Sequence, residues 1–461
     1  NLAGGDILGG TITASGGAAL VMTASSTLDG VTLDADLSVP DNSALTVKDG
    51  LTLNGTLTMT HSGTYNLTLV NFSGTQTLGG TGTVQFVNTN NYASYNNVLQ
   101  PVDGGTLTIG PGITIHGQRG TVGAPGDFFG STPLPLVNQG TIEADAAGQT
   151  ILVTGSSVTN SGTLAASGGK LSVSGLASPM AGTLSAGVGG VISINGNLTI
   201  DPAGIVNVDL GGAAAGQFGQ IQVTGATTLG GTLNLALAGG YQPASGDSLK
   251  IITFTSHTGT FATVNGASIS ANLVWAPVYE SQDVMLVAGS PQLADVAAPD
   301  GSKTPSLPPS QESEISLPIV SALEQAAIDH WEAAGLDPRL VALLRSVDVS
   351  IADLGNDVLA ITAGNHIILS DDADGYGWFA DPIAPDHGDF APTSNDHVFS
   401  ALAGTGAAGR FDLLTVIDHE LGHVLGLPDQ MRGDDLMQQL LAPGVRKTPS
   451  NADIDAASGG E

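Results

Sequence analysis

The first 290 residues alternate hydrophobic and polar positions over short runs. These runs are rich in Thr, Val, Leu and Ile and are separated by Gly, Asn, Asp and Ser, as in Leu51–Met59, Thr106–Ile109 and Ile113–Ile115. Alternation with a period of two predicts strands that bury one face. A helical period is not found before residue 318. This part of the chain is therefore predicted to be all β.

An internal repeat favours one β architecture. The segment Asn-Gln-Gly-Thr-Ile that starts at Asn138 matches Asn-Ser-Gly-Thr-Leu at Asn160, 22 residues later. A Gly-Thr-Leu motif recurs at Gly55, Gly105, Gly162, Gly182 and Gly231. A period near 20 favours a right-handed β-solenoid (β-helix), in which stacked coils bury side chains that a single coil could not. A sandwich or barrel of about ten strands is the alternative, because its strands also recur every 8–12 residues.

The pattern changes after residues 291–316, which are rich in Pro and Ser and are predicted to form an extended linker. Helical spacing then predicts a helix from Ser316, as its cap, to Gly335. Its buried face is expected to carry Val320, Leu323, Ala327, Ile328 and Trp331.

Two strands and a second helix are expected after this first helix. The strands are predicted at Val347–Leu354 and His366–Ser370, and the helix at residues 412–425. The chain is therefore predicted to be multidomain, with a β-solenoid repeat domain (1–290), the linker (291–316) and a small α/β (α+β) domain (317–461).

The helix at 412–425 carries the strongest chemical signal in the chain. His419 and His423 are four residues apart, so a helix places both imidazoles on one face, where they can bind one metal ion. Glu420 follows the first histidine directly and lies off that axis, where it can act as a general base on a water molecule. This is the H-E-x-x-H arrangement of a zinc peptidase.

The residues beyond this helix offer a third ligand. Gly426 tolerates the left-handed conformation at which helices commonly end, and Pro428 discourages a return to helix. The chain can then turn and bring Asp429 back to the metal. Zinc accepts a carboxylate oxygen, and three protein ligands with one open position make a catalytic site.

These residues resemble the signature of a known family, in the order His419-Glu420-x-x-His423-x-x-Gly426-x-x-Asp429. The run is similar to that of the metzincin zinc metalloproteases, with the aspartate that snapalysin-type peptidases have in place of the usual third histidine. The resemblance covers residues 317–456 and implies a metzincin-like peptidase domain. It implies Zn²⁺ bound by the two histidines and Asp429, with Glu420 as the catalytic base.

The same resemblance implies that Met437 is the Met-turn residue beneath the metal. Metzincins often have a tyrosine just after this methionine, whereas Gln438 and Gln439 stand here. The stabilisation of the oxyanion therefore has no assigned residue.

The charge balance limits the classes of partner that the chain can bind. There are 11 Lys and Arg residues against 42 Asp and Glu, for a net charge of −31. Such a surface repels nucleic acid and anionic lipid and attracts cations such as Ca²⁺. The chain has no cysteine, which excludes disulfides and thiolate zinc sites and favours a bacterial surface protein. A stretch of about 18 apolar residues that could span a membrane is also absent from the sequence.

Four aspartates form a candidate calcium loop: Asp371, Asp372, Asp374 and Asp381. Spaced carboxylates around a glycine are compatible with Ca²⁺ binding. The pattern departs from an EF-hand, which would need Asp in place of Ser370 and Glu in place of Asp381. An acidic, solvated turn is the alternative.

Two other groups of residues have both a functional and a structural interpretation. His387 and His397 could hold a second, structural zinc or simply be exposed. The aromatic residues of the loops within 90–135 could form a binding surface or cap a gap in the solenoid; they are Tyr92, Tyr95, Phe128 and Phe129.

Composition over residues 1–290 resembles that of autotransporter passengers and haemagglutinin-like adhesins. This resemblance implies an adhesin-like rod that is secreted or displayed on a bacterial cell surface. The N-terminal Asn1-Leu-Ala-Gly-Gly lacks a leader pattern and reads as the interior of a repeat, so we expect a processed chain or part of a longer one.

Two functions follow as hypotheses. The first is a zinc endopeptidase on a β-solenoid stalk, in which Glu420 assists the attack of zinc-bound water on peptide bonds of a peptide or protein substrate. An aspartate ligand should make that water less acidic than three histidines would, so we expect a modest rate or a specialised substrate. The second is a structural or adhesive rod that self-associates or binds other surface proteins, with a peptidase-like domain that is self-processing or inactive.

Overall fold

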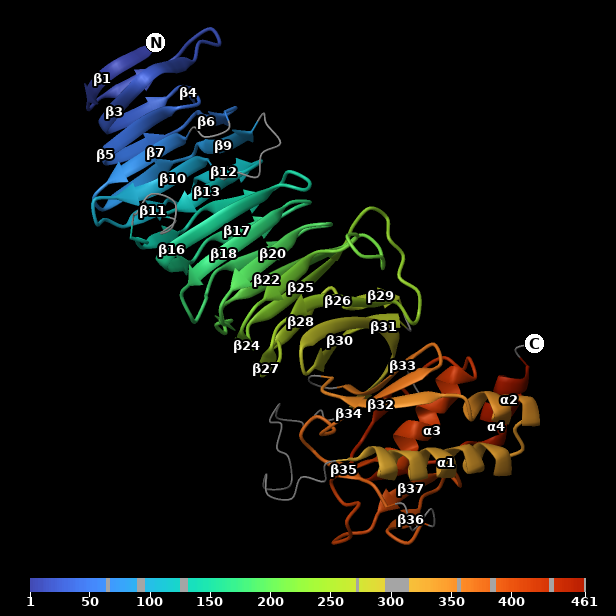
Figure 1. Ribbon diagram of the computed structural model, residues 1–461. Coiled ribbons are helices and arrows are strands. Elements are labelled where there is room, and N and C mark those ends of the chain that lie inside the picture. The colour runs from blue at the N-terminus through green and yellow to red at the C-terminus, as the bar shows by residue number, and fades with distance from the viewer. Residues whose placement is uncertain are drawn as a thin grey trace. The chain divides into compact units, whose positions relative to one another are not determined.

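The computed structural model describes residues 1–63, 67–88, 96–124, 132–270, 273–294, 315–354, 358–381, 387–430 and 435–459. The fold is mostly β (Figure 1). The chain forms two compact units. The N-terminal unit comprises Asn1–Gln242, Lys250–Gly266 and Ser281–Asp283, and the C-terminal unit comprises Pro243–Leu249, Ala267–Glu280 and Val284–Glu461. None of the described helices is long and apolar enough to cross a membrane.

Most strands of the N-terminal unit fall into three parallel rows. The first row is β1 (Leu2–Leu8), β2 (Thr11–Thr13), β3 (Leu20–Asp34), β5 (Ser43–Leu53), β7 (Thr68–Ser73), β8 (Gln76–Gly80), β10 (Asn97–Val102), β11 (Leu107–Ile109), β13 (Gly120–Gly123), β14 (Leu136–Asn138), β16 (Thr150–Asn160), β18 (Lys170–Leu176), β20 (Val191–Asn195), β23 (Gln220–Val223) and β26 (Ser248–Thr253). The second row is β4 (Leu37–Val39), β6 (Thr56–His61), β9 (Thr83–Asn88), β12 (Thr114–Gly117), β15 (Thr141–Ala144), β17 (Thr163–Ala166), β19 (Thr183–Ala186), β22 (Ile205–Leu210), β25 (Thr232–Leu237) and β28 (Thr263–Asn265). The third row is β21 (Leu198–Thr199), β24 (Ala226–Thr228) and β27 (Ser256–Thr258).

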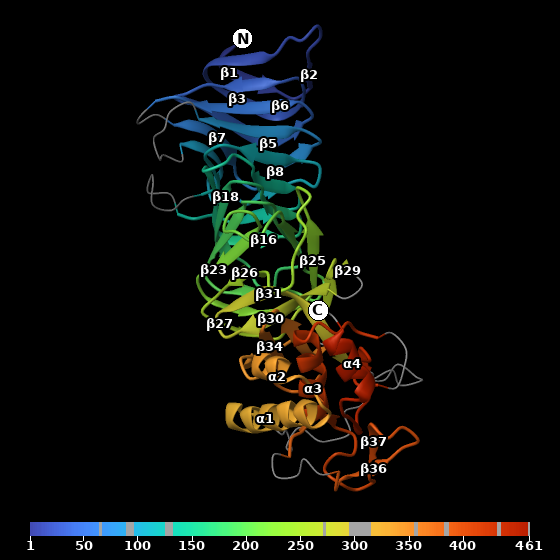
Figure 2. The ribbon, with the colours of Figure 1, turned by 90° about the vertical axis from the view of Figure 1, so that its right-hand side faces the viewer.

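Strands of one row pair in parallel with partners from the next turn of the chain, as the layers in Figures 1 and 2 show. The matched segments of the repeat lie side by side, because Asn138 pairs with Asn160 and its side-chain amide donates to the Asn160 Oδ1 at 2.8 Å. At Gly162 only a glycine fits, because an added Cβ would collide with the Gly140 carbonyl of the neighbouring turn. The repeat therefore corresponds to stacked turns.

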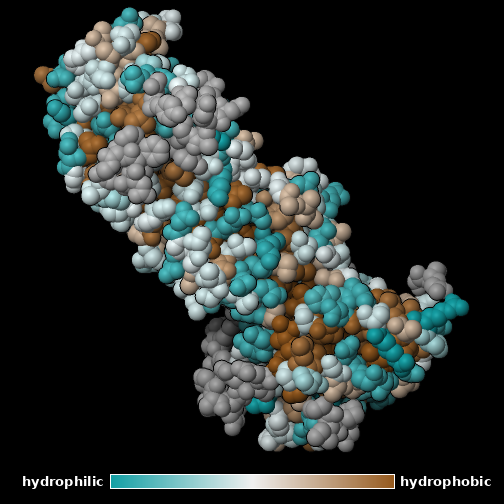
Figure 3. All heavy atoms as spheres, viewed as in Figure 1, coloured by the Kyte–Doolittle hydropathy of each residue, from teal (hydrophilic) through white to brown (hydrophobic). Residues whose placement is uncertain are grey.

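The alternation in the sequence places several aliphatic side chains of each turn inside. Successive strands of the second row align Ile115, Ile142, Leu164, Leu184, Val206 and Leu233 as direct neighbours. All six are fully buried. Along β15, β19 and β22 these buried positions alternate with partly buried ones. Polar and neutral residues cover much of the face seen in Figure 3.

The C-terminal unit contains the helices. They are α1 (Leu317–Ala333), α2 (Pro338–Leu344), α3 (Leu413–Val424) and α4 (Asn451–Ser458). Its strands are β29 (Ser268–Ser270), β30 (Leu273–Glu280), β31 (Asp283–Ala294, from Val284), β32 (Asp348–Ala352), β33 (Val358–Ala363), β34 (His366–Ser370), β35 (Trp378–Phe379), β36 (Phe390–Pro392), β37 (Val398–Ala401), β38 (Phe411–Asp412), β39 (Leu440–Leu441) and β40 (Val445–Lys447). One sheet has the order β39–β31–β33–β34–β32.

The two helices expected from the sequence are confirmed. Helix α1 follows Ser316 and buries the five residues predicted for its inner face. It packs against α3, where the Trp331 indole N–H donates to the Asp418 backbone carbonyl at 3.2 Å. Helix α2 and strand β33 were not predicted, and they complete the core around α3.

The C-terminal unit begins before residue 290, where the sequence predicted the end of the repeat domain. Strand β30 and β31 from Val284 belong to the C-terminal unit, although their sequence continues the β pattern of the repeats. Most of the predicted linker, residues 295–314, lies outside the described residues. The same holds for Tyr92, Tyr95, Phe128 and Phe129.

Candidate metal centre

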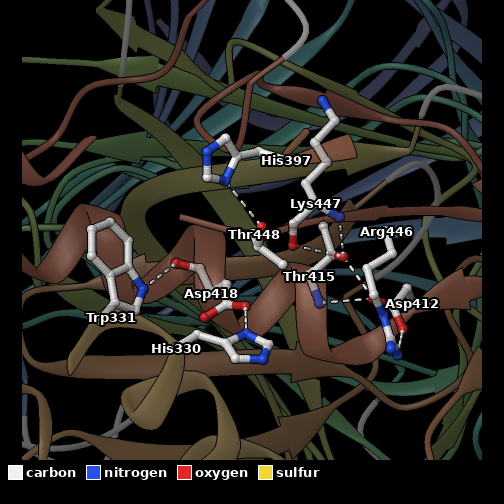
Figure 4. A network of polar contacts seen from close by, with 9 residues as sticks. All are labelled: His330, Trp331, His397, Asp412, Thr415, Asp418, Arg446, Lys447 and Thr448. Atoms are coloured by element: carbon white, nitrogen blue, oxygen red, sulfur yellow. Dashed lines mark hydrogen bonds and ion pairs between the residues drawn. The ribbon is translucent and has the colours of Figure 1, made fainter. Parts of the chain in front are cut away.

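Helix α3 is fixed at its N-terminus by a buried carboxylate. Asp412 caps the helix, accepting from the Thr415 backbone N–H at 3.2 Å and from its hydroxyl at 2.6 Å. Arg446 donates to both oxygens of Asp412, at 3.0 and 2.8 Å. Because both partners are almost fully buried, this charged pair holds the start of α3 in one orientation (Figure 4).

The C-terminus of α3 ends as the sequence predicts. Gly426 adopts φ +85° and its N–H donates to the His423 carbonyl at 2.9 Å. The next N–H, of Leu427, reaches back to the Gly422 carbonyl at 3.0 Å. These two bonds form a Schellman motif, which turns the chain sharply toward Asp429.

The turn brings three candidate ligands together. Ligand atoms of His419, His423 and Asp429 all lie within 4.8 Å of one another. The Asp429 Oδ1 is 3.3 Å from the Nε2 of His419 and 3.2 Å from that of His423. Ligands about 2.0 Å from a tetrahedral zinc ion are about 3.3 Å from each other, so the spacing suits such an ion.

Backbone carbonyls fix which nitrogen of each ring faces the centre. The Nδ1 of His419 donates to the Leu436 carbonyl at 2.8 Å, and the Nδ1 of His423 donates to the Leu427 carbonyl at 2.8 Å. In the neutral rings each Nε2 therefore carries a lone pair. Both Nε2 atoms and both oxygens of Asp429 are buried without a hydrogen-bond partner. Electron-rich atoms gathered in this way favour a cation between them, so these residues fit a divalent metal ion.

The pKa values of His423 and Asp429 reflect the opposite charges of their neighbours. Burial disfavours the charged forms of His423 and Asp429, but their mutual attraction outweighs it. The carboxylates of Asp429 and Glu420 raise the pKa of His423 to about 8. The two imidazoles lower the pKa of Asp429 to about 2.

Glu420 lies beside the three candidate ligands and is shielded from solvent. It is fully buried, and this burial raises the pKa of its carboxyl above the ordinary value. The Thr362 hydroxyl of β33 lies 2.5 Å from Oε2 and holds that oxygen. The other oxygen, Oε1, is buried without a hydrogen-bond partner and can accept a proton.

Met437 lies directly against α3. An added Cβ on Gly422 would collide with the Met437 sulfur, so the glycine inside the H-E-x-x-H run makes room for this methionine. The Met437 carbonyl accepts from the Gln430 N–H at 2.7 Å, next to Asp429. The turn at Leu436 and Met437 therefore contacts His419 through the Leu436 carbonyl and the residue next to Asp429 through the Met437 carbonyl.

Buried polar residues support this turn and the helix behind it. Lys447 donates through Nζ to the Asp435 carbonyl at 2.9 Å and to the Gln438 Oε1 at 2.8 Å, and so holds the turn around Met437. His330 of α1 pairs with Asp418 of α3 at 2.8 Å (Figure 4). Burial raises the pKa of Asp418 to about 6 despite this pairing.

The candidate calcium residues are not gathered in the same way. Among the described residues, only His419, His423 and Asp429 form a group of three potential ligands. Asp372 accepts from the Ser370 hydroxyl at 3.3 Å, and burial next to other carboxylates raises the pKa of Asp371. Calcium binding through Asp371, Asp372, Asp374 and Asp381 stays a prediction.

The two histidines considered for a second zinc have other neighbours. The ring of His387 stacks on Phe399 with centroids 3.7 Å apart. The Nδ1 of His397 lies 3.3 Å from the Thr448 hydroxyl. The described part of the chain brings no third ligand to either of them.

Sequence reasoning missed several residues of the centre. Thr362 lies in the apolar run Val358–Ala363, which is compatible with either a strand or a helix and gives no sign of the contact with Glu420. Arg446 and Lys447 are two of only 11 Lys and Arg residues, and this rarity is the one feature of the sequence that could have drawn attention to them. The carbonyls of Leu427 and Leu436 leave no trace in the sequence, because any residue supplies one.

No family model matches this chain, and no curated protein matches it in sequence.

Proposed function

We propose that the C-terminal unit is a metzincin-like zinc endopeptidase. The observation that carries the proposal is the convergence of two oriented imidazoles and one carboxylate beside the buried Glu420. Two nitrogens and one oxygen suit Zn²⁺ and leave the open coordination position of a catalytic site. A zinc ion held there would polarise a peptide carbonyl and make a water molecule more acidic.

The chain's own residues supply the remaining chemistry. Glu420 takes the proton of the attacking water at Oε1 and delivers it to the leaving amine. Thr362 holds Oε2 and so aims the other oxygen. Burial raises the pKa of the Glu420 carboxyl toward neutral pH. A group that both takes and gives a proton is most effective when its pKa is close to the working pH.

We further propose that the N-terminal unit is a β-solenoid that displays the peptidase outside a bacterial cell. The stacked aliphatic row and the parallel pairing of turns 20 to 31 residues apart support this architecture. Asparagine side chains also stack outside, with Asn265 donating to Asn234 and Asn234 to Asn207, each at 2.8 Å. A polar rod of this kind also fits the second candidate, an adhesive surface protein.

Hydrolysis of an added peptide by the full chain tests the peptidase. With zinc present, Glu420→Gln should lower the rate at least about 1,000-fold while zinc binding persists, because only the proton transfer is lost. The exposed Glu332, which pairs with Arg345 at 2.9 Å, gives the matched control Glu332→Gln with unchanged rate. Equal activity of both variants would refute the peptidase and leave the rod.

A further inference from the structure

The end of β31 is paired on both sides. Its antiparallel partners on β33 run Ser290↔Thr362, Pro291↔Ile361, Gln292↔Ala360 and Leu293↔Val358. Its parallel partners on β39 are Leu293↔Leu440 and Ala294↔Leu441. Residues 290–294 are therefore held as a central strand of the sheet in the C-terminal unit.

Both partner strands belong to the borders of the metal centre. Strand β33 carries Thr362, whose hydroxyl contacts Glu420, and it packs on α3. Strand β39 begins three residues after Met437, whose carbonyl is bonded to the residue next to Asp429. A strand held between β33 and β39 therefore lies between the part of the sheet that orients the base and the turn that orients the ligands.

An extended peptide is recognised most simply by adding it as a strand to an open sheet edge, where its backbone is bonded whatever its sequence. In this chain the edge of β33 that faces away from β34 is taken by β31. The contact is close, because an added Cβ on the buried Gly289 would collide with the Ile361 side chain and the Thr362 carbonyl. The chain has thus placed its own backbone where an added peptide would pair.

We propose that Ser290–Ala294 occupies the position of a peptide substrate and is the first peptide that the centre hydrolyses. The proposal rests on the proposed function. Water adds across one C–N bond within this segment, so its oxygen ends on the carbonyl carbon as a new carboxylate and its proton, relayed by Glu420, ends on the new α-amino group. The reaction requires no other reactant. Cleavage frees the edge of β33 for other extended peptides.

The full chain, purified without metal, tests the proposal when zinc is added. We expect two fragments whose new ends map by mass spectrometry to residues 290–294. The rate constant should not depend on protein concentration, because the strand and the centre belong to one chain. Glu420→Gln should stay intact.

Gly289→Ala supplies a second test, because its methyl group has to push β31 away from β33. We expect self-cleavage at least tenfold slower than in the parent chain, while hydrolysis of an added peptide is equal or faster. The matched control is Gly79→Ala, since a Cβ there meets nothing within 4 Å. This control should change neither rate.

Two results would overturn the inference. If the chain stays intact while an added peptide is cleaved equally by the parent and Gly289→Ala, the segment does not occupy the substrate position, and the peptidase itself stands. If neither the chain nor any added peptide is cleaved, the proposed function fails as well.

Discussion

At the scale of single residues, the candidate metal centre depends on a few atoms, each with one role. The carbonyls of Leu436 and Leu427 fix the tautomers of His419 and His423, so both lone pairs point to the same place. Asp429 arrives only because Gly426 can adopt a positive φ. The donors themselves were predictable from the sequence, whereas the atoms that aim them were not.

Zinc and the proton should compete for the Nε2 of His423. The pKa of this residue is raised to about 8, so without metal it is mostly protonated below that pH, and zinc has to displace the proton. The apparent zinc affinity should therefore rise about tenfold per pH unit between about pH 6 and pH 8 and level off above. Competition with a chelator of known affinity at each pH measures this. A flat profile would contradict the assigned ligand.

Gly422→Ala should destabilise the C-terminal unit. An alanine inside a helix is ordinarily favourable by up to about 1 kcal/mol. Here the new methyl group meets the Met437 sulfur, so we expect a net loss of about 1–3 kcal/mol in the free energy of unfolding. Denaturant unfolding of the variant and of Gly422→Ala/Met437→Ala checks the cause. The two substitutions should be less costly together than the sum of each alone, and simple additivity would disprove the contact.

At the scale of elements, α3 is held by contacts with two strands, β40 and β33, that lie far apart in the sequence. Asp412 at its start is paired with Arg446 from β40, and Glu420 in its middle contacts Thr362 from β33. The helix itself followed from the spacing of its apolar residues, as did α1, because a local period determines each one. Strand β33 was missed because Val358–Ala363 is a short apolar run, and such runs do not distinguish strand from helix without their partners.

Arg446→Met should be among the most damaging single changes in the C-terminal unit. Arg446 is 2% exposed and lies 4.3 Å above the Phe390 ring, so its loss leaves the buried Asp412 charge without compensation. The expected cost is about 3–5 kcal/mol. Arg345→Met removes the exposed pair with Glu332 and should cost under about 1 kcal/mol. Equal unfolding free energies for the two variants would show that the buried pair does not hold the start of α3.

At the scale of the whole molecule, two kinds of order meet in one chain. The N-terminal unit repeats a short alternation, and its sequence indicated both the stacking and the 22-residue match of Asn138 with Asn160. The C-terminal unit is built from contacts with no repeat, so its sequence indicated the helices and the ligands but not the sheet order. The position of β31 shows the limit most clearly. Its residues read as one more β run, and only the folded structure pairs them with β33 and β39.

The most direct test of the account is the zinc K-edge X-ray absorption spectrum of the full chain with one equivalent of zinc. We predict a four-coordinate ion with two imidazole nitrogens and with oxygen at about 2.0–2.1 Å, and a loss of one imidazole in His423→Ala. Zinc that is not retained, or an ion surrounded by six oxygens and unaffected by that variant, would contradict the metal centre and the peptidase built on it.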